Sequence, residues 1–451
     1  MPAAHLSAAI VSQGDEIVLG QTLDSNSRWL ASRLFERGVV PLEHVSVPDD
    51  RERIARTILR LAGEVELIVV SGGLGPTPDD LTREALAQAM GSPLVEDPLA
   101  LDQIEAWFAA RGRPMQAINR VQAMRPRDAV SLENRFGTAP GIWGKVEVGR
   151  TSAGTIHAGD VVPGKRCDVF CLPGPPREMM PMFEEHVLPR LKRPPGRVVA
   201  TRTLHTLGLG ESEIAARLGR APGGDLMRRG RQPSVGTTAS GGVVSVRLRI
   251  EDAASEEQAS TRLAQDEAIV RELLGDSVFA DGNATVAATV VRLLQERGET
   301  VTLAESCTGG LVGKMLTDVP GSSRVFERGW VTYSNEAKAQ LLGVAPALFE
   351  GPGAVSREVA SAMAVGARSA ARAAWGIGVT GIAGPDGATA SKPVGSVFIA
   401  VAGPVGDADV RLFGLTGDRE AIREQSAQIA LSVLLLNLTG RRSVRLLREQ
   451  R

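Results

Sequence analysis

The sequence predicts an α/β protein in three parts: a doubly wound α/β domain at residues 1–192, a small α+β module at 197–281 and a second α/β domain at 283–445. Two observations support this division. Short apolar runs alternate with helical patterns in the first and last parts, as in parallel sheets covered by helices. Residues 192–196, KRPPG, have the composition of a linker. With 451 residues, each part is long enough to bury its own core.

The first part opens with a buried strand pattern. Residues 65–70, VELIVV, form a short apolar, β-branched run of the kind found in parallel sheets. Capping residues at 24–27 precede the first helix, and Gly38 ends it. The predicted elements are strand 7–12, helix 28–37, strand 39–47, helix 49–62, strand 65–70, helix 81–90, strand 169–172 and helix 178–191.

A long glycine-rich loop, SGGLGPTPDDLTRE at 71–84, follows the third strand. Its backbone N–H groups can approach a ligand closely and suit a phosphate. Its carboxylates are hard oxygen ligands of the type that holds a hydrated divalent cation such as Mg²⁺. The alternative is that Asp79 or Asp80 only caps the helix that follows. The candidate ligand-binding residues are Gly72, Gly73, Gly75 and Thr77, and the candidate metal ligands are Asp79, Asp80 and Glu84.

The middle part carries no cluster of acids and bases. Its order of elements resembles a KH-like topology, but no Gly-x-x-Gly with flanking basic residues lies in a helix-turn-helix context. Direct nucleic-acid binding is therefore unsupported. The predicted elements are strand 198–207, helix 211–218, strand 234–239, strand 243–250, helix 255–274 and strand 278–280.

The third part centres on a strand at 301–304 that breaks at 305–310, ESCTGG, before a helix at 311–317. Such a turn lies at the carboxyl edge of a sheet and aims backbone N–H groups at the site. Its hydroxyls and thiol therefore share a site suited to an anion or a developing oxyanion. The alternative is a helix cap with a tight turn. The other predicted elements are helix 284–297, helix 357–373, strand 376–380, strand 396–402, strand 410–415 and helix 419–438.

Lysine usage also draws attention to the third part. Of 51 lysines and arginines only six are lysines, and three of them, Lys314, Lys338 and Lys392, lie in or near its motifs. Arginine cannot serve where an amine must lose its proton. This distribution suggests a lysine with a chemical role.

Composition excludes several classes of protein. The formal net charge of −1 provides no strong field for nucleic acid or membrane binding, and no window has the 18 or so apolar residues of a membrane helix. The start of the chain has no cationic segment typical of a signal peptide. Three cysteines form neither a disulfide framework nor a zinc motif, so we expect a cytoplasmic protein.

Eight motifs, in order and with matching spacing, resemble the full-length CinA family of competence/damage-inducible proteins over nearly the whole chain. Two departures from the family pattern are Gln13, where an apolar residue is more usual, and Pro78, where a bulkier residue is common. The motifs are GDEIVLGQTLDSN (14–26), SGGLGPTPDDLTRE (71–84), ENRFGTAPG (133–141), LPGPPREM (172–179), AESCTGG (304–310), YSNEAK (333–338), GAVS (353–356) and VTGIAGPDG (379–387).

The resemblance implies a bifunctional hydrolase of pyridine-nucleotide salvage. The first domain resembles the molybdopterin-binding fold of the MogA/MoeA type, associated in the family with metal-dependent ADP-ribose pyrophosphatase activity. The last domain resembles nicotinamide mononucleotide deamidase, which hydrolyses the nicotinamide amide to nicotinate and needs no cofactor. A non-catalytic protein that binds a molybdopterin-like ligand, or a partner protein in competence, is the alternative.

For the deamidase, the resemblance assigns the chemistry to Ser306, Lys338 and Tyr333. Residues around 308–310 are expected to supply N–H groups to the oxyanion. All five histidines lie outside the third part, so a neutral Lys338 is the expected base, with Tyr333 relaying the proton or orienting the amine. Cys307 is the rival nucleophile. The expected substrate-binding residues of this turn are Thr308, Gly309 and Gly310.

Five more residues complete the expected binding sites. Thr380 and Gly381 of the second glycine-rich turn are expected to hold the nucleotide, and Arg419 its phosphate, although a surface role for Arg419 is equally compatible with the sequence. Asn26 and Asn134, in two of the front motifs, are expected to bind substrate. The expected partners are nicotinamide mononucleotide, ADP-ribose and a second copy of the chain in a homodimer, with neither direct nucleic-acid nor membrane contact.

Overall fold

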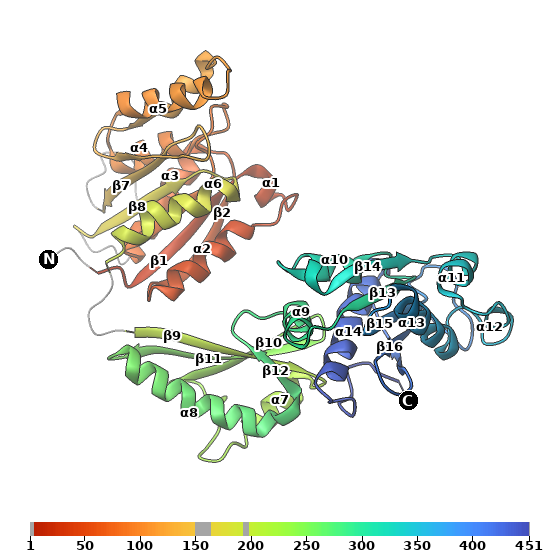
Figure 1. Cartoon of the computed structure of the whole chain (residues 1–451). Helices are drawn as coiled ribbons and strands as arrows, with labels where there is room; N and C mark the ends of the chain where they lie inside the picture. The colour runs from red at the N-terminus through yellow and green to blue at the C-terminus, as the bar shows by residue number, and fades with distance from the viewer. Residues whose placement is uncertain (1–3, 149–163, 193–197, 451) are drawn as a thin grey trace. The chain divides into compact units, whose positions relative to one another are not determined.

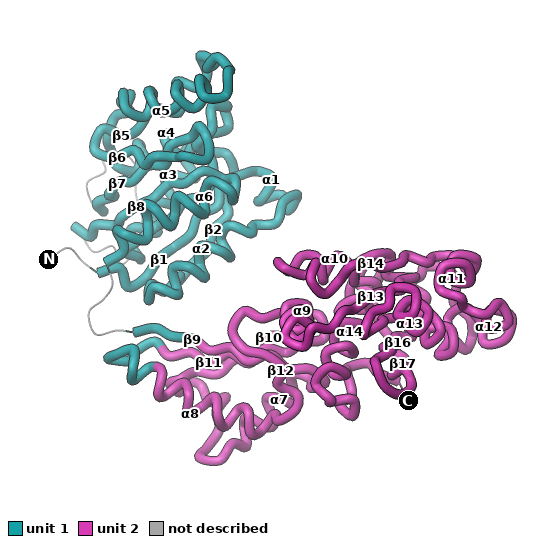
Figure 2. The backbone as a smooth tube through the Cα atoms, viewed as in Figure 1, with its two compact units in different colours: residues 1–200, 251–259 teal, residues 201–250, 260–451 magenta. Residues whose placement is uncertain are grey.

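The computed structural model describes residues 4–148, 164–192 and 198–450. It consists of two compact units (Figure 2): residues 1–200 with 251–259, and residues 201–250 with 260–451. The linker expected at 192–196 falls, after Lys192, outside the described residues.

The first unit contains a six-stranded sheet of order β2-β1-β3-β8-β7-β6 (Figure 1). The four strands β2, β1, β3 and β8 are parallel, whereas β7 and β6 are antiparallel to their neighbours. The α/β class is confirmed, but the sheet is mixed, and the sequence did not predict its two antiparallel strands. The strands are β1 (Ser7–Gln13), β2 (Val40–Val47), β3 (Leu67–Ser71), β6 (Val130–Leu132), β7 (Gly141–Glu147) and β8 (Arg166–Leu172), with a separate pair, β4 (Leu94–Glu96) and β5 (Met124–Pro126).

Helices cover both faces of this sheet. Leu30 and Met179 pack on one face, whereas Ile58 and Leu86 pack on the other. The helix expected at 178–191 is interrupted: α-helical geometry ends at Met182, and a π turn and a 3-10 turn follow. Pro181, inside the helix, lacks the N–H that a regular α-helix needs. The helices are α1 (Asp15–Val18), α2 (Ser25–Glu36), α3 (Arg51–Glu64), α4 (Thr82–Met90), α5 (Pro98–Ala109), α6 (Pro176–Met182), η1 (Ala117–Ala123), η2 (Phe183–Val187) and η3 (Leu188–Arg190).

The middle module is a four-stranded sheet of order β10-β11-β9-β12 with two helices. Strand β10 is antiparallel to β11, and β12 is antiparallel to β9. This is the α+β arrangement that the sequence predicts. The elements are β9 (Val198–Leu207), α7 (Glu211–Leu218), β10 (Ser234–Ser240), β11 (Val243–Ala253), α8 (Glu256–Leu274), η4 (Gly275–Ser277) and β12 (Val278–Asp281).

The remaining elements form a five-stranded sheet of order β14-β13-β15-β16-β17. Strand β13 is parallel to β14 and β15, whereas β16 and β17 are antiparallel to their neighbours. The strands are β13 (Val301–Glu305), β14 (Phe326–Val331), β15 (Trp375–Gly381), β16 (Ser396–Ala402) and β17 (Asp409–Gly414); the helices are α9 (Val286–Arg297), α10 (Leu311–Thr317), η5 (Ser322–Arg324), α11 (Asn335–Leu342), α12 (Ala347–Glu350), α13 (Arg357–Ala371) and α14 (Arg419–Leu438).

Helix α13 packs closely on this sheet because small residues line the contact. Ala360 and Ala364 pack with alanines of β16. A Cβ on Gly376 or Gly378 of β15 would overlap the backbone of α13. Residues of α9, α10 and α14 pack with the strands in a separate, larger core. The sheet is therefore held between helices, and the ends of β13 and β15 that carry the glycine-rich turns have fixed positions.

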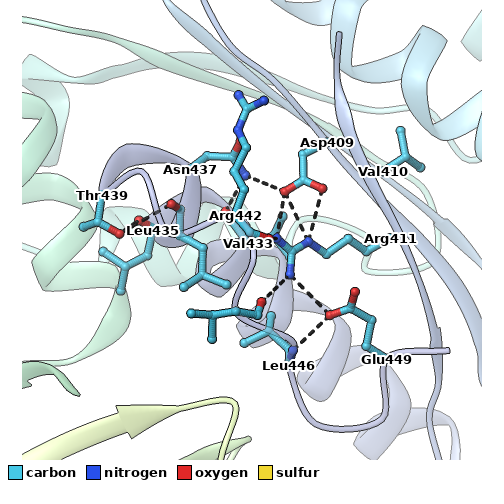
Figure 3. A network of polar contacts seen from close by, with 12 residues as sticks. Asp409, Val410, Arg411, Val433, Leu435, Asn437, Thr439, Arg442, Leu446 and Glu449 are labelled. Carbon is cyan, nitrogen blue, oxygen red and sulfur yellow. Dashed lines mark hydrogen bonds and ion pairs between the residues drawn. The ribbon is translucent and has the colours of Figure 1, made fainter. Parts of the chain in front are cut away.

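A buried arginine ties the end of the chain to this domain (Figure 3). Arg411 of β17 pairs with Asp409 at 3.0 Å and with Glu449 at 3.2 Å. It also donates to the carbonyls of Arg442 at 2.7 Å and Val444 at 2.8 Å. The segment after α14 is thus held against the edge strand β17, to which Phe413 and Glu449 add a bridge.

Within the described ranges, no helix combines the length and the apolar character needed to cross a membrane.

Candidate active site

The turn between β13 and α10 presents Ser306 at the end of the sheet, as the sequence predicts. The backbone N–H of Ser306 donates to the Val379 carbonyl of β15 at 3.0 Å. Gly309 and Gly310 have φ values of 59° and 96°, a left-handed conformation that glycine adopts without steric cost. The turn therefore depends on its two glycines and on the neighbouring strand.

Lys338 of α11 lies beside Ser306. Its Nζ is 3.2 Å from Ser306 Oγ and 3.2 Å from the Tyr333 carbonyl oxygen. The side chain is almost fully buried, since the residue is 2% exposed. Burial lowers the pKa of Lys338 from its ordinary value, and the nearby Cys307 and Glu336 only partly oppose this shift. An amine with a lowered pKa beside a hydroxyl is suited to accept the hydroxyl proton.

Cys307 is poorly suited to be the nucleophile. The residue is buried, and burial raises the pKa of its thiol to about 12, with a further contribution from Glu305. Since the thiolate is the reactive form of cysteine, such a thiol is inert at neutral pH. The burial of Cys307 and the raised pKa of its thiol favour Ser306 as the nucleophile.

The helix terminus after Ser306 is already occupied, which corrects one sequence-based expectation. The N–H of Gly310 donates to the Glu305 carboxylate at 2.9 Å, and the N–H of Gly309 donates to the Ser306 carbonyl at 3.1 Å. Both amides are thus engaged within the protein. Glu305 supplies the negative charge that a helix terminus attracts, and the Gly310 amide donates to it. Thr308 is different: its Oγ1 is buried and has no hydrogen-bond partner among the described residues.

Tyr333 and Arg419 form a pair at the same site. The Tyr333 residue is 60% exposed, and its hydroxyl accepts a hydrogen bond from Arg419 Nη2 at 2.7 Å. Arg419 also donates to the Gly384 carbonyl. The phenol thus has Arg419 as its partner, whereas Lys338 contacts the Tyr333 backbone. This arrangement favours a binding role for the phenol over a proton relay.

Arg423, one turn further along α14, donates to the carbonyls of Cys307 at 3.2 Å and Thr308 at 3.0 Å. It therefore supports the Ser306 turn from the side of α14. The two arginines at the start of this helix both reach the site, one by contacting Tyr333 and the other by contacting the turn. Their spacing of four residues places both side chains on one face of α14.

In the second glycine-rich turn, which follows β15, Thr380 and Gly381 contact other parts of the same domain. The Thr380 hydroxyl donates to the Ala354 carbonyl at 2.8 Å and is buried. A Cβ on Gly381 would lie 2.7 Å from the Val397 side chain. In this structure the Thr380 hydroxyl is committed to the GAVS segment rather than to a substrate, and Gly381 permits close contact with β16.

In the first unit, the glycine-rich loop between β3 and α4 is held by internal hydrogen bonds. Asp80 accepts from the Thr77 N–H at 2.9 Å and from the Thr77 hydroxyl at 2.5 Å. Arg83, which is buried, donates to the carbonyls of Leu74 at 2.6 Å and Gly75 at 2.9 Å. These contacts give the loop a defined shape without any ligand.

Gly72 and Gly73 have φ values of 104° and 68°. The Gln13 side chain fills the space against Gly73 and donates to Asp49 at 2.7 Å and to the Asp79 carbonyl at 3.0 Å. Gln13 therefore connects the loop to Asp49.

The three acidic residues of the loop have different surroundings. Asp79 is exposed, Asp80 is bonded to Thr77, and Glu84 lies 3.8 Å from Arg83. No group of three or more acidic, histidine or cysteine side chains in the described ranges is arranged to hold a metal ion. Glu84 Oε2, however, is buried and has no hydrogen-bond partner among the residues that the structure describes. The donors therefore do not fit a metal cage made by the protein alone, but they fit an ion held by one or two carboxylates and a ligand phosphate.

Asn26 and Asn134 have different hydrogen-bond partners. Asn26 Nδ2 donates to Ser71 Oγ at 2.8 Å and to the Gly174 carbonyl at 2.7 Å, which places Asn26 beside the start of the loop. Its Oδ1 is buried and has no partner in the described part of the chain. Asn134 instead donates to Glu178 at 2.9 Å. Asn26 thus remains a candidate for ligand binding, whereas the Asn134 amide is engaged with Glu178.

Comparison with known proteins agrees with this organisation. Residues 9–193 match the model of a probable molybdopterin binding domain, residues 201–280 match the damage-inducible protein CinA KH domain, and residues 283–438 match the CinA C-terminal domain.

Relatives match the chain over almost its whole length. A relative from Symbiobacterium thermophilum, named among the competence-damage inducible proteins, is 43% identical over 445 residues, 96% of this chain and 99% of its own. A CinA-like protein of Syntrophotalea carbinolica is 40% identical over 95% of this chain and 98% of its own. A crystal structure of an Agrobacterium tumefaciens competence/damage inducible protein is 41% identical and covers 34% of this chain and 93% of its own, with a TM-score of 0.33. The chain belongs to the CinA family, with a molybdopterin-binding-type domain, a KH domain and a CinA C-terminal domain.

Proposed function

We propose that the C-terminal domain hydrolyses the amide of nicotinamide mononucleotide, giving nicotinate mononucleotide and ammonia. The observation that carries this proposal is the 3.2 Å approach of Lys338 Nζ to Ser306 Oγ, with the lysine buried. An amide carbon is a poor electrophile, so its hydrolysis needs an activated hydroxyl. A buried lysine next to a serine can supply that activation, and residues 283–445 contain no histidine that could do so.

In the first half of the reaction, Ser306 Oγ forms a bond to the amide carbon, and its proton passes to Lys338 Nζ. The carbonyl π bond opens, and its electron pair becomes an oxyanion. When this intermediate collapses, the C–N bond breaks, and Lys338 returns the proton to the leaving nitrogen, which departs as ammonia. The result is an ester between Ser306 and the nicotinoyl group.

In the second half, water attacks the ester while Lys338 takes its proton. The C–O bond to Ser306 then breaks, and the serine recovers its proton from Lys338. Lys338 therefore serves in turn as base and acid, which requires an amine whose pKa is lowered toward the working pH.

Two features support the proposed binding of the nucleotide. Arg419 carries a positive charge beside the exposed ring of Tyr333 and suits the phosphate. The Thr308 hydroxyl, buried and without a partner in the described part of the chain, suits the polar amide. We assign the phosphate to Arg419 and the amide to Thr308.

A second candidate function is ADP-ribose hydrolysis by the front domain. It is favoured by the left-handed glycines of the Gly72–Thr77 loop. It is also favoured by the buried Asn26 Oδ1 and Glu84 Oε2, which have no hydrogen-bond partner in the described ranges. In this proposal the diphosphate binds the loop, and Asp79, Asp80 or Glu84 shares a divalent ion with it. Such an ion, when bound, neutralises the phosphates and helps to generate hydroxide from water. The alternative is a non-catalytic protein that binds a molybdopterin-like ligand or a competence partner.

Incubation of the purified chain with nicotinamide mononucleotide or ADP-ribose tests these functions separately. We expect ammonia from the first substrate and AMP from the second. Tight binding of either nucleotide without any product would support the non-catalytic alternative. Light scattering over a wide concentration range tests the proposed homodimer, and a monomer mass throughout would contradict it.

A further inference from the structure

Glu305, the residue immediately before Ser306, has an unusual position for a carboxylate. It is the last residue of β13 and is 3% exposed. In the described part of the chain, its side-chain hydrogen bonds all come from backbone N–H groups at the start of α10: Gly310 at 2.9 Å, Val312 at 3.2 Å and Gly313 at 2.9 Å. Burying a carboxylate costs free energy unless such donors compensate it.

These bonds join both ends of the turn that carries Ser306. The carboxylate holds the helix, while the Glu305 carbonyl accepts from the Thr332 N–H at 2.8 Å. Ser306 itself donates to the Val379 carbonyl, and Arg423 holds the carbonyls of Cys307 and Thr308. The turn is thus fixed from β14, β15, α10 and α14, and Glu305 is its link to α10.

We propose that Glu305 is a positioning residue for the deamidation: its carboxylate holds the turn so that Ser306 Oγ stays beside Lys338 and the α10 amides are withheld from the substrate. This inference rests on the proposed function of the C-terminal domain. It follows that the oxyanion takes its donors next to Ser306, where Thr308 Oγ1 is unpartnered among the described residues, and not from Gly310, Val312 or Gly313.

The same carboxylate influences the choice between serine and cysteine. Burial is the main cause of the raised pKa of Cys307, and the negative charge of Glu305 adds to it. Removal of this charge therefore favours the thiolate, and loosening of the turn exposes the thiol. The structure accordingly links Glu305 to two measurable properties: the rate of deamidation and the reactivity of Cys307.

Glu305→Gln tests the inference, because glutamine has nearly the same shape but is neutral, and its NH₂ group cannot accept from a backbone N–H. We expect kcat for ammonia release to fall about 10²-fold, the effect of misplacing a reacting group by about 1 Å, with little change in KM. Alkylation of Cys307 by iodoacetamide, followed by mass spectrometry of its peptide, should become several-fold faster. Glu327→Gln, on the exposed part of β14, is the matched control and should change neither property.

Wild-type kcat and wild-type Cys307 reactivity in a folded Glu305→Gln protein would overturn the inference. If this variant does not fold, hydrogen exchange of the wild-type chain is the deciding measurement. The amides of Gly310, Val312 and Gly313 should be strongly protected. Rapid exchange would refute the proposal that the Glu305 carboxylate holds them. An absence of ammonia release by the wild-type chain would refute the proposed function, while the alkylation and exchange measurements would still report on the turn.

Discussion

Lys338 Nζ and Ser306 Oγ lie 3.2 Å apart, although the two residues are 32 positions apart in the sequence. The lysine comes from α11 and the serine from the turn after β13. Their approach results from the packing of these elements beside one another. A pair of this kind makes the roles of base and nucleophile separately testable.

Replacement of Ser306 by alanine should abolish nearly all ammonia release from nicotinamide mononucleotide. The residual activity should be no more than binding and oxyanion stabilisation provide, roughly 10³–10⁴-fold over water in serine hydrolases. Cys307→Ala, the matched neighbour, should retain most activity, because the buried thiol is protonated at neutral pH. An active Ser306→Ala enzyme that thiol alkylation blocks would assign the nucleophile to Cys307.

Lys338→Arg should be nearly as inactive as Lys338→Ala, since a guanidinium stays protonated and cannot act as a base. In the wild-type chain, burial lowers the pKa of Lys338 from its ordinary value of 10.5. The rate therefore depends on the neutral amine: kcat/KM should rise with pH and level off below pH 10.5, and it should fall as the pH drops through the lowered pKa. Appreciable activity in Lys338→Arg would exclude the lysine as base.

Tyr333→Phe should raise KM several-fold and leave most of kcat, because the phenol contacts Arg419 and not the lysine amine. The comparison substrate is nicotinamide riboside, which lacks the phosphate proposed to bind Arg419. Its kinetics should be almost unchanged by the substitution. A loss of kcat by orders of magnitude with both substrates would instead restore the proton-relay role for Tyr333.

Arg411→Ala should destabilise the C-terminal domain by about 3–5 kcal/mol, the cost of removing one partner from a buried ion pair. Asp409 and Glu449 would lose their common cation, and the segment after α14 would lose its attachment to β17. Urea unfolding provides the measurement. Arg328→Ala, on the exposed part of β14, should change the free energy of unfolding by less than about 1 kcal/mol. Equal effects of the two substitutions would contradict the structural role of Arg411.

Asp80→Asn should reduce ADP-ribose hydrolysis by orders of magnitude, because the neutral amide lacks the charge proposed to help hold a divalent ion at the front loop. Deamidation should stay intact, since this loop and Ser306 belong to separate units. Chelation with EDTA should have the same selective effect if a divalent ion bridges loop and substrate. Parallel loss of both activities in a folded variant would contradict two independent sites. Insensitivity to EDTA would contradict the metal requirement alone.

Much of the fold was predictable because it depends on local patterns. Apolar β-branched runs such as 65–70 indicated the parallel strands, and capping residues such as Asp24 marked helix starts. The antiparallel strands β6 and β7 escaped prediction, since they are short or only partly buried and carry weak periodicity. The prediction of one continuous helix at 178–191 was wrong after Met182, where a π turn and a 3-10 turn follow. Hydrophobic periodicity does not distinguish such turns from an α-helix.

By itself, the sequence determined the position of the Ser306 turn, since a strand, two glycines and a helix in succession define it locally. It also showed that residues 283–445 contain no histidine, and the resemblance to the CinA family named Lys338 as the candidate base. Only the tertiary structure decided how the surrounding groups are used: Glu305 caps α10, and the Tyr333 hydroxyl pairs with Arg419, which is 86 positions away. Hydrogen-bond partners and burial arise when distant segments pack together, so no local pattern of residues specifies them.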